Sequence, residues 1–228
     1  CSTAKYSPKR SIYVICFNNP DSLNNDFEQD AVDELNHELG HLVVPNGLHN
    51  DDSTSGDNFA ECVADVFSCL KHAQRFGDPA KAIDRLAWQR AVDFTLSDSD
   101  THFTTFALEN LKAKLGGIQA ALLTPSQIAG LAWSIAAESS LHQTLIDELN
   151  FSFEPARDRA KDRKTPEGKL RALGDFICKG DPGYYSLKTA LAALKPCLDT
   201  GETFYGTKLN LTGTYWDNVR NEVRKIEL

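Results

Sequence analysis

The sequence predicts an α+β fold that is predominantly helical, with a small N-terminal sheet and a helical C-terminal lobe. Residues 11–17 (SIYVICF) are rich in β-branched and aromatic side chains, which is typical of a strand. Beyond residue 26, apolar side chains recur at helical spacing through most of the chain. The 228 residues, 41% of them hydrophobic, are enough for one domain. We expect a single domain over 1–228, with approximate lobes at 11–76 and 80–228.

Two helices are expected directly after the strand and a turn-rich segment at 18–25. The first covers about 26–44, because apolar side chains recur there on one helical face, at Phe27, Ala31, Leu35, Leu39 and Leu42. Pro45, Asn46 and Gly47 end it. A polar segment at 48–58 leads to the second helix, at about 59–75, which ends before Gly77 and Pro79.

The remaining chain is also predicted to be mostly helical. Amphipathic patterns indicate helices at 80–96, 102–115 and 187–194, and Thr165-Pro166 and Thr214 each begin another. Thr124-Pro125-Ser126-Gln127 predicts a helix start with a capping box. The charged segment 156–168 is expected to be a solvated helix face or a connector. Residues 200–213 have the Gly content and alternation of a hairpin.

Composition and charge exclude some classes of protein. The net charge of -8 argues against a protein that binds nucleic acid through a broad basic surface. No apolar run approaches the length of a membrane span. We therefore expect a soluble chain that does not act on a nucleic acid, and the acidic charge does not exclude a protein or peptide substrate. Exported and cytoplasmic locations both fit, and the oligomeric state stays open.

The six cysteines favour reduced thiols over disulfides. No CxxC pair occurs, and a chain of 228 residues can build a core without cross-links. Cys16, Cys62 and Cys69 lie in apolar segments, where a thiol behaves as a small buried hydrophobic group. An even number of cysteines is also compatible with disulfides, so that alternative stays open.

The first expected helix carries the sequence His37-Glu38-Leu39-Gly40-His41. Residues four apart lie on one face of a helix, so both imidazoles can bind one metal ion. Zinc accepts imidazole nitrogens at about 2.0–2.1 Å. Glu38 lies beside His37 and can reach a water on the ion, which is the position of a general base. The alternative is a helix with two surface histidines and a solvated glutamate.

The second expected helix offers a third metal ligand. Catalytic zinc needs three protein ligands and leaves its fourth position to water. Glu61 and Asp65 share one helical face. If the two helices pack antiparallel, Glu61 can meet the ion that His37 and His41 hold. Asp65 would then accept the remaining N–H of a ligand histidine, most simply His37. Alternatively, both carboxylates are solvated charges near a helix start.

These motifs resemble those of the gluzincin metallopeptidases, the thermolysin-like group in particular. HExxH is followed by ExxAD, with Glu61 twenty residues after His41, and the similarity covers about residues 34–68. The resemblance implies a zincin-like catalytic domain with a strand, an HExxH helix and an ExxAD helix beside a largely helical lobe. It implies zinc as the cofactor and hydrolysis of a peptide bond by an activated water.

A second, shorter similarity to that group lies at Thr101-His102-Phe103-Thr104-Thr105. The resemblance implies that His102 is a catalytic donor to the oxyanion, where developing negative charge needs stabilisation. Asp98 or Asp100 could orient it. Alternatively, His102 only packs near a helix start. The tyrosine donor of the family has no clear counterpart, and nothing selects among Tyr184, Tyr185 and Tyr205. His49, His72 and His142 are expected to be structural or solvent-facing.

Two alternative functions stay open. The first is a regulatory or effector metallopeptidase with one protein target, since HELGH with Glu61, Ala64 and Phe67 also resembles peptidases that cut phage repressors and transcription factors. The second belongs to another class, a non-catalytic zinc-stabilised interaction domain whose fourth zinc position is closed. Glu38 argues against the second, because a structural site needs no general base.

Overall fold

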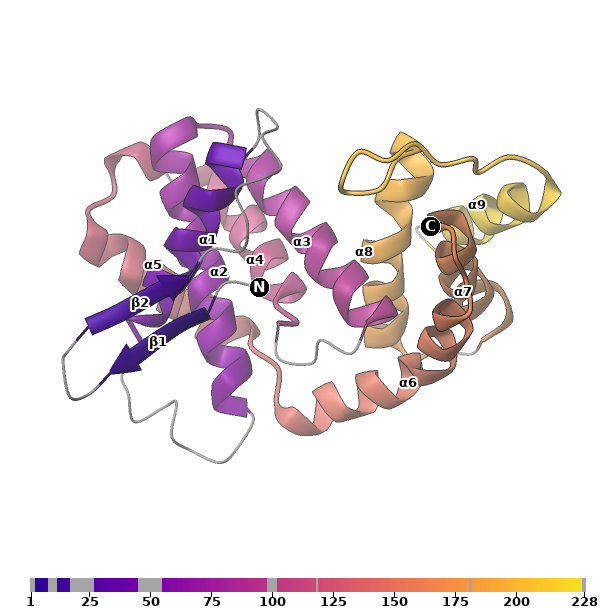
Figure 1. The fold of residues 1–228 in the computed structure, drawn as a ribbon, viewed down its shortest axis with the longest axis horizontal. Helices are drawn as coiled ribbons and strands as arrows, with labels where there is room; N and C mark the ends of the chain where they lie inside the picture. Colours follow the sequence, from indigo (N-terminus) through magenta and orange to yellow (C-terminus); the bar gives the residue numbers. More distant parts are fainter. Residues whose placement is uncertain are drawn as a thin grey trace. The chain divides into compact units, whose positions relative to one another are not determined.

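Figure 1 shows the computed structural model, which describes residues 3–7, 12–16, 27–44, 55–97, 102–117, 119–180 and 182–226. The described part contains nine α-helices. Their bounds are α1 Phe27–His41, α2 Ser55–Phe76, α3 Pro79–Leu96, α4 Thr105–Lys114, α5 Pro125–Ser139, α6 Gln143–Lys161, α7 Pro166–Lys179, α8 Tyr184–Thr200 and α9 Thr214–Ile226. Two short 3₁₀ helices, η1 (Leu115–Gly117) and η2 (Ala120–Leu122), separate α4 from α5.

The predicted α+β class is wrong, because the packed part of the described chain is all-helical. The strands β1 (Thr3–Ser7) and β2 (Ile12–Cys16) pair antiparallel with each other, with Tyr6 opposite Tyr13. A two-stranded hairpin cannot form a core layer of its own. The described buried side chains lie on helices and on the segments between helices. The predicted sheet is therefore no layer of this fold.

The chain divides into two compact units. The first contains Cys1–Ile83 and Phe106–Ser140, and the second contains Asp84–Thr105 and Leu141–Leu228. In the first unit, α2 packs against both α1 and α5. Its central position explains its apolar composition, since the side chains of Val63, Val66 and Leu70 are fully buried. The packing of α2 against α1 and α5 determines which face of α2 is turned towards α1.

The second unit has an aromatic core. Phe153 of α6 contacts Phe94 of α3 and Phe176 of α7, with ring centroids 6.1 Å and 4.7 Å apart. The guanidinium of Arg157 is buried and donates to the carbonyl of Phe94 and to Asn150 Oδ1. The charged segment that begins at residue 156 is therefore not simply a solvated face, because its first turn belongs to the core.

Several local predictions can be compared with the structure. Thr124 and Gln127 form the predicted capping box at the start of α5, so that prediction is confirmed. α2 begins at Ser55 and not at residue 59. The predicted hairpin at 200–213 reduces to a single bridge between Glu202 and Lys208. Cys62 and Cys69 are buried free thiols, as expected.

Among the described residues, no helix combines the length and apolarity that a membrane crossing requires.

Candidate metal centre

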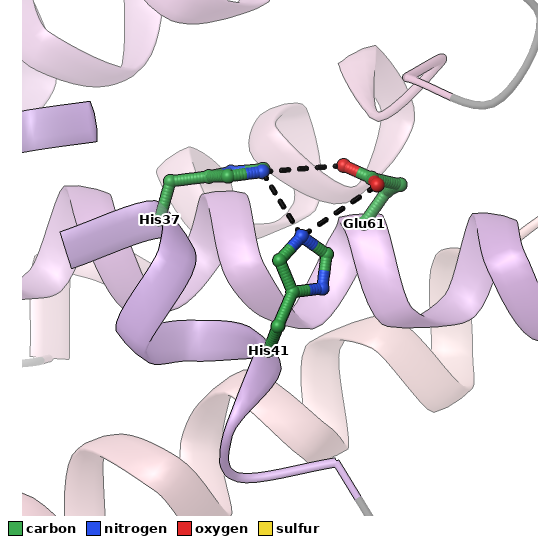
Figure 2. A group of neighbouring side chains, drawn as sticks. All are labelled: His37, His41 and Glu61. Atoms are coloured by element: carbon green, nitrogen blue, oxygen red, sulfur yellow. Dashed lines mark hydrogen bonds and ion pairs between the residues drawn. The ribbon is translucent and has the colours of Figure 1, made fainter. Parts of the chain in front are cut away.

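His37, His41 and Glu61 meet between α1 and α2 (Figure 2). One ligand atom from each of them lies within 4.8 Å of the other two. His37 Nε2 is 3.1 Å from His41 Nε2 and 3.3 Å from Glu61 Oε2, and His41 Nε2 is 3.6 Å from Glu61 Oε1. The structure thus brings together the three residues that the sequence singled out as metal ligands.

The spacing of these atoms can be compared with that around a metal ion. A tetrahedral zinc ion with ligands at about 2.0–2.1 Å separates neighbouring ligand atoms by about 3.3 Å. The separation of 3.1 Å between the two Nε2 atoms and that of 3.3 Å from His37 Nε2 to Glu61 Oε2 are close to that value, while the 3.6 Å from His41 Nε2 runs to the other carboxylate oxygen, Oε1. Two imidazole nitrogens and one carboxylate form a donor set that suits zinc better than calcium or magnesium, which prefer oxygen ligands. The donor set fits zinc, and the atoms lie close enough for one ion to bring them together.

Asp65 determines which nitrogen of His37 faces this centre. Its Oδ1 lies 2.7 Å from His37 Nδ1, and its side chain is 1% exposed. A carboxylate only accepts hydrogen bonds, so Nδ1 carries the proton and the lone pair of neutral His37 lies on Nε2. The Nε2 atom is the one that faces His41 and Glu61. This is the arrangement expected of a metal-binding histidine.

The charges around His37 favour a cation. Burial lowers its pKa, but the carboxylates of Asp65 and Glu61 raise it by more, and the resulting pKa is about 9. In the metal-free protein, both ring nitrogens of His37 are therefore protonated at neutral pH, and the side chain carries a positive charge. Zinc would take the place of the Nε2 proton as the positive charge between the two carboxylates.

The close approach of α1 and α2 depends on Gly40. A Cβ at this position would lie 2.6 Å from Ala64 Cα and 3.0 Å from the Ala64 carbonyl oxygen. No side chain larger than hydrogen fits there without moving a helix backbone. Gly40 lies between His37 and His41 in the chain, and Ala64 lies between Glu61 and Asp65. The site therefore forms beside this close contact of the two helices.

A tryptophan holds the chain just after His41. Trp133 of α5 donates from Nε1 to the Val43 carbonyl at 3.1 Å. Its ring also packs edge-on against Phe59 of α2, with centroids 5.0 Å apart. The turn after α1 is thereby attached to both α5 and α2. Sequence reasoning missed Trp133, because no local pattern relates it to Val43, 90 residues earlier.

Glu38 lies on α1 in the turn between the two histidines, and its side chain is partly exposed. Consecutive helical residues differ in direction by about 100°. Glu38 is therefore adjacent to the ligand face and separate from the three ligand residues. A position beside the ligands is what a general base requires. The catalytic role of Glu38 itself stays a prediction.

His102 lies in the second unit, in the turn before α4, where its carbonyl accepts from the backbone N–H of Thr104. Burial raises the pKa of the Asp93 carboxyl, while the charges of Arg90 and His102 lower it. Asp93 is thus an acidic neighbour of His102. Asp98 and Asp100, which the sequence proposed for that role, lie outside the described residues. The metal centre belongs to the first unit, so the catalytic role of His102 stays a prediction.

The other histidines have identifiable surroundings in most cases. His142 caps α6, since its side chain accepts from Thr144 N. His72 of α2 contacts Asp33 of α1. His49 lies outside the described residues. Tyr184, Tyr185 and Tyr205 are exposed residues of the second unit, so none is singled out as a donor.

Comparison of the chain with known protein families, with curated proteins and with solved structures found no match.

Proposed function

We propose that this protein is a zinc-dependent peptidase. The observation that carries the proposal is the convergence of His37, His41 and Glu61 within 4.8 Å, on the two helices that the HExxH and ExxAD motifs predicted. The side chains of these residues are 13%, 22% and 14% exposed. They are therefore largely buried, and each keeps a small part of its surface exposed.

In this proposal, each of several residues has a separate role in hydrolysis. When bound, zinc would lower the pKa of a coordinated water and polarise the substrate carbonyl. Glu38 accepts the proton of the attacking water and passes it to the leaving amine. Asp65 keeps His37 in the tautomer that binds the metal. His102 belongs to the second unit, and the oxyanion-donor role that the resemblance implies for it stays a prediction.

The choice of a peptide substrate rests on the resemblance of the motifs to the gluzincins. The ligand set alone would also suit the hydrolysis of other carbonyl compounds or a closed structural zinc site. The presence of Glu38 favours a catalytic site over a closed structural one, because a closed site has no metal-bound water for a base to deprotonate.

The test compares the zinc-loaded wild type with Glu38→Gln on a proteome-derived peptide pool, with cleavage products identified by mass spectrometry. We expect Glu38→Gln to retain one zinc per chain and to lose activity by about 10²–10⁴-fold, the usual contribution of a general base. Glu34→Gln is the matched control, because Glu34 lies one turn earlier on α1 and is also partly exposed. It should cleave like the wild type.

One result would contradict the assigned general base, and another would contradict the proposed activity. Normal cleavage by zinc-loaded Glu38→Gln would show that another group is the base. A wild type that binds zinc and cleaves neither the peptide pool nor folded proteins would indicate the non-catalytic zinc domain. The cleavage products also distinguish a peptidase with one protein target from one of broad specificity.

A further inference from the structure

A second group of polar contacts joins α1 to α2 beyond the metal centre. Asp33 lies on α1, one turn before His37. Its two carboxylate oxygens each lie 2.9 Å from His72 Nδ1. Its backbone carbonyl accepts a hydrogen bond of 2.7 Å from Ser68 Oγ. Ser68 and His72 both belong to α2.

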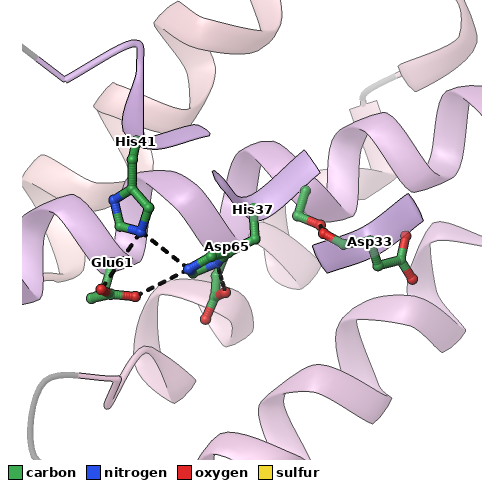
Figure 3. A network of polar contacts seen from close by, with 6 residues as sticks. Asp33, His37, His41, Glu61 and Asp65 are labelled. Carbon is green, nitrogen blue, oxygen red and sulfur yellow. Dashed lines mark hydrogen bonds and ion pairs between the residues drawn. The ribbon is translucent and has the colours of Figure 1, made fainter. Parts of the chain in front are cut away.

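These contacts extend the series of polar contacts between α1 and α2 that begins at the metal centre. Along α1 the order is Asp33, His37 and His41, and the partners on α2 follow in the reverse order: His72 and Ser68, then Asp65, then Glu61. The two helices are therefore antiparallel, with polar contacts at successive turns. Figure 3 shows Asp33 on α1 beyond His37, on the side away from His41.

We propose that Asp33, Ser68 and His72 form a positioning clamp that sets the angle between α1 and α2 and thereby the geometry of the zinc site. The proposal rests on the zinc-binding role of His37, His41 and Glu61. The clamp residues touch neither the substrate nor the metal, and they act through the two helix backbones.

A helix pair needs two fixed points to define its crossing angle. The close contact of Gly40 with Ala64 supplies one point, in the middle of the metal centre. By itself, this contact fixes the distance between the helices and leaves them free to rotate about it. The His37–Asp65 pair lies close to this contact, and the clamp supplies a more distant fixed point at Asp33, seven residues and about 10 Å along the helix from Gly40.

The distance between Gly40 and Asp33 along α1 determines how strongly a movement at the clamp affects the metal ligands. A displacement of about 1 Å at Asp33 corresponds to a rotation of about 6°, given the axial rise of a helix. That rotation moves His37, three residues from Gly40, by about 0.4 Å. Metal–ligand distances tolerate about 0.2 Å. Loosening the clamp by about 1 Å thus shifts the backbone of His37 by more than the spread of about 0.2 Å that is usual for metal–ligand distances.

The chemistry of the clamp suits this role. Hydrogen bonds are directional, whereas apolar contacts alone allow two helices to slide. The Ser68 side chain is 4% exposed, so its hydrogen bond is protected from water. The ring of His72 also packs against Phe76, with centroids 4.9 Å apart, which restricts its orientation. Both donors on α2 are therefore held towards Asp33.

The test measures zinc affinity by competition with a chelator, together with the visible absorption spectrum of the Co²⁺-substituted protein. His72→Leu removes the contact with Asp33. His72→Asn places an amide nitrogen close to the position of Nδ1 and should restore the contact. Ser68→Ala removes the second hydrogen bond. All measurements are made on the full chain, at a temperature where the metal-free variants remain folded.

Gln74→Leu is the matched control. Gln74 lies on α2, two residues after His72, and donates a hydrogen bond of 2.7 Å to the Leu123 carbonyl. Its loss destabilises the same helix without affecting a contact with α1. Any effect on zinc affinity that follows from lower stability alone should therefore appear in this control.

We expect His72→Leu to weaken zinc binding about tenfold, at the lower end of what losing an orienting residue costs, and to alter the Co²⁺ spectrum. Ser68→Ala should act in the same direction, while His72→Asn and Gln74→Leu should resemble the wild type. A wild-type affinity and spectrum in His72→Leu would overturn the clamp while leaving the zinc site intact. An equal loss in Gln74→Leu would also overturn it. If the wild type binds neither Co²⁺ nor Zn²⁺, the proposed function is wrong. The positioning role of Asp33, Ser68 and His72 is then also wrong, because it rests on the zinc site.

Discussion

His37 and Asp65 form a pair in which Nδ1 of the histidine lies 2.7 Å from Oδ1 of the aspartate. The aspartate is almost fully buried, on the side of the imidazole away from His41 and Glu61. This pair joins the two motifs across the helix interface, because His37 comes from HExxH and Asp65 from ExxAD. It holds His37 with its Nε2 atom turned towards His41 and Glu61.

The first prediction concerns this pair. Asp65→Asn keeps the size of the side chain but removes its charge, so the imidazole of His37 becomes a weaker and less well oriented ligand. We expect zinc affinity to fall by about 10–100-fold. Chelator competition at constant pH measures the change. An unchanged affinity would show that Asp65 has no part in metal binding.

The second prediction concerns Gly40. Gly40→Ala places a Cβ 2.6 Å from Ala64 Cα, so α1 and α2 must move apart. The overpacking should cost about 1–3 kcal/mol, which exceeds the gain of about 1 kcal/mol from replacing glycine inside a helix. We expect lower stability in urea unfolding and weaker zinc binding.

Gly130→Ala is the control for this variant. Gly130 lies inside α5, and a Cβ there would have no neighbour within 4 Å. The same substitution should therefore stabilise the protein by up to about 1 kcal/mol, because only the helix propensity changes. If Gly40→Ala behaved like Gly130→Ala, the close approach of α1 and α2 would not be required for the site.

The third prediction concerns the pH dependence of the metal-free protein. The pKa of His37 rises from 6.5 to about 9 on folding, as the net result of burial, which lowers it, and the nearby carboxylates of Asp65 and Glu61, which raise it more. A group whose pKa is raised on folding stabilises the protein fully below its unfolded pKa, and this stabilisation is lost as the pH rises through the folded pKa. The window is therefore pH 6.5 to about 9.

Over this window, the free energy of unfolding should fall by at most about 3 kcal/mol. Urea unfolding in the presence of a chelator measures it at each pH. Asp65→Asn should show a shallower dependence, because it lacks the carboxylate that interacts most strongly with His37. A wild type of constant stability from pH 6.5 to 9 would contradict the electrostatic account of the site.

The candidate ligands could be predicted because their spacing is local. His37 and His41 share a face through helical periodicity, and so do Glu61 and Asp65. Once both segments are recognised as helices, only the antiparallel packing of α1 and α2 has to be inferred. The structure brings the predicted residues together, and the binding of zinc to them stays a prediction.

The wrong fold class has an equally local cause. The β-branched run at 11–17 indicates an extended conformation, but it carries no information about how many strands pair with it. The prediction from this run is a small N-terminal sheet, and the resemblance implies a strand there as well. In the structure, β2 pairs with β1 in a hairpin, while the core of the described residues is helical.

Other features could not be read from the sequence because they depend on contacts between distant segments. The approach of Gly40 to Ala64, the contact of Asp33 with His72 and the hydrogen bond from Trp133 join residues from 24 to 90 positions apart. No periodicity marks these partners. They follow from the relative position of packed helices, which local propensity does not determine.

The central claim is that one zinc ion binds between α1 and α2. Its most direct test is a crystal structure of the zinc-loaded protein, with an anomalous difference map from data collected at the zinc absorption edge. We expect one strong peak about 2.0–2.1 Å from the Nε2 atoms of His37 and His41 and from a carboxylate oxygen of Glu61. A map without a peak among these three residues, or with its peak on other ligands, would contradict the account.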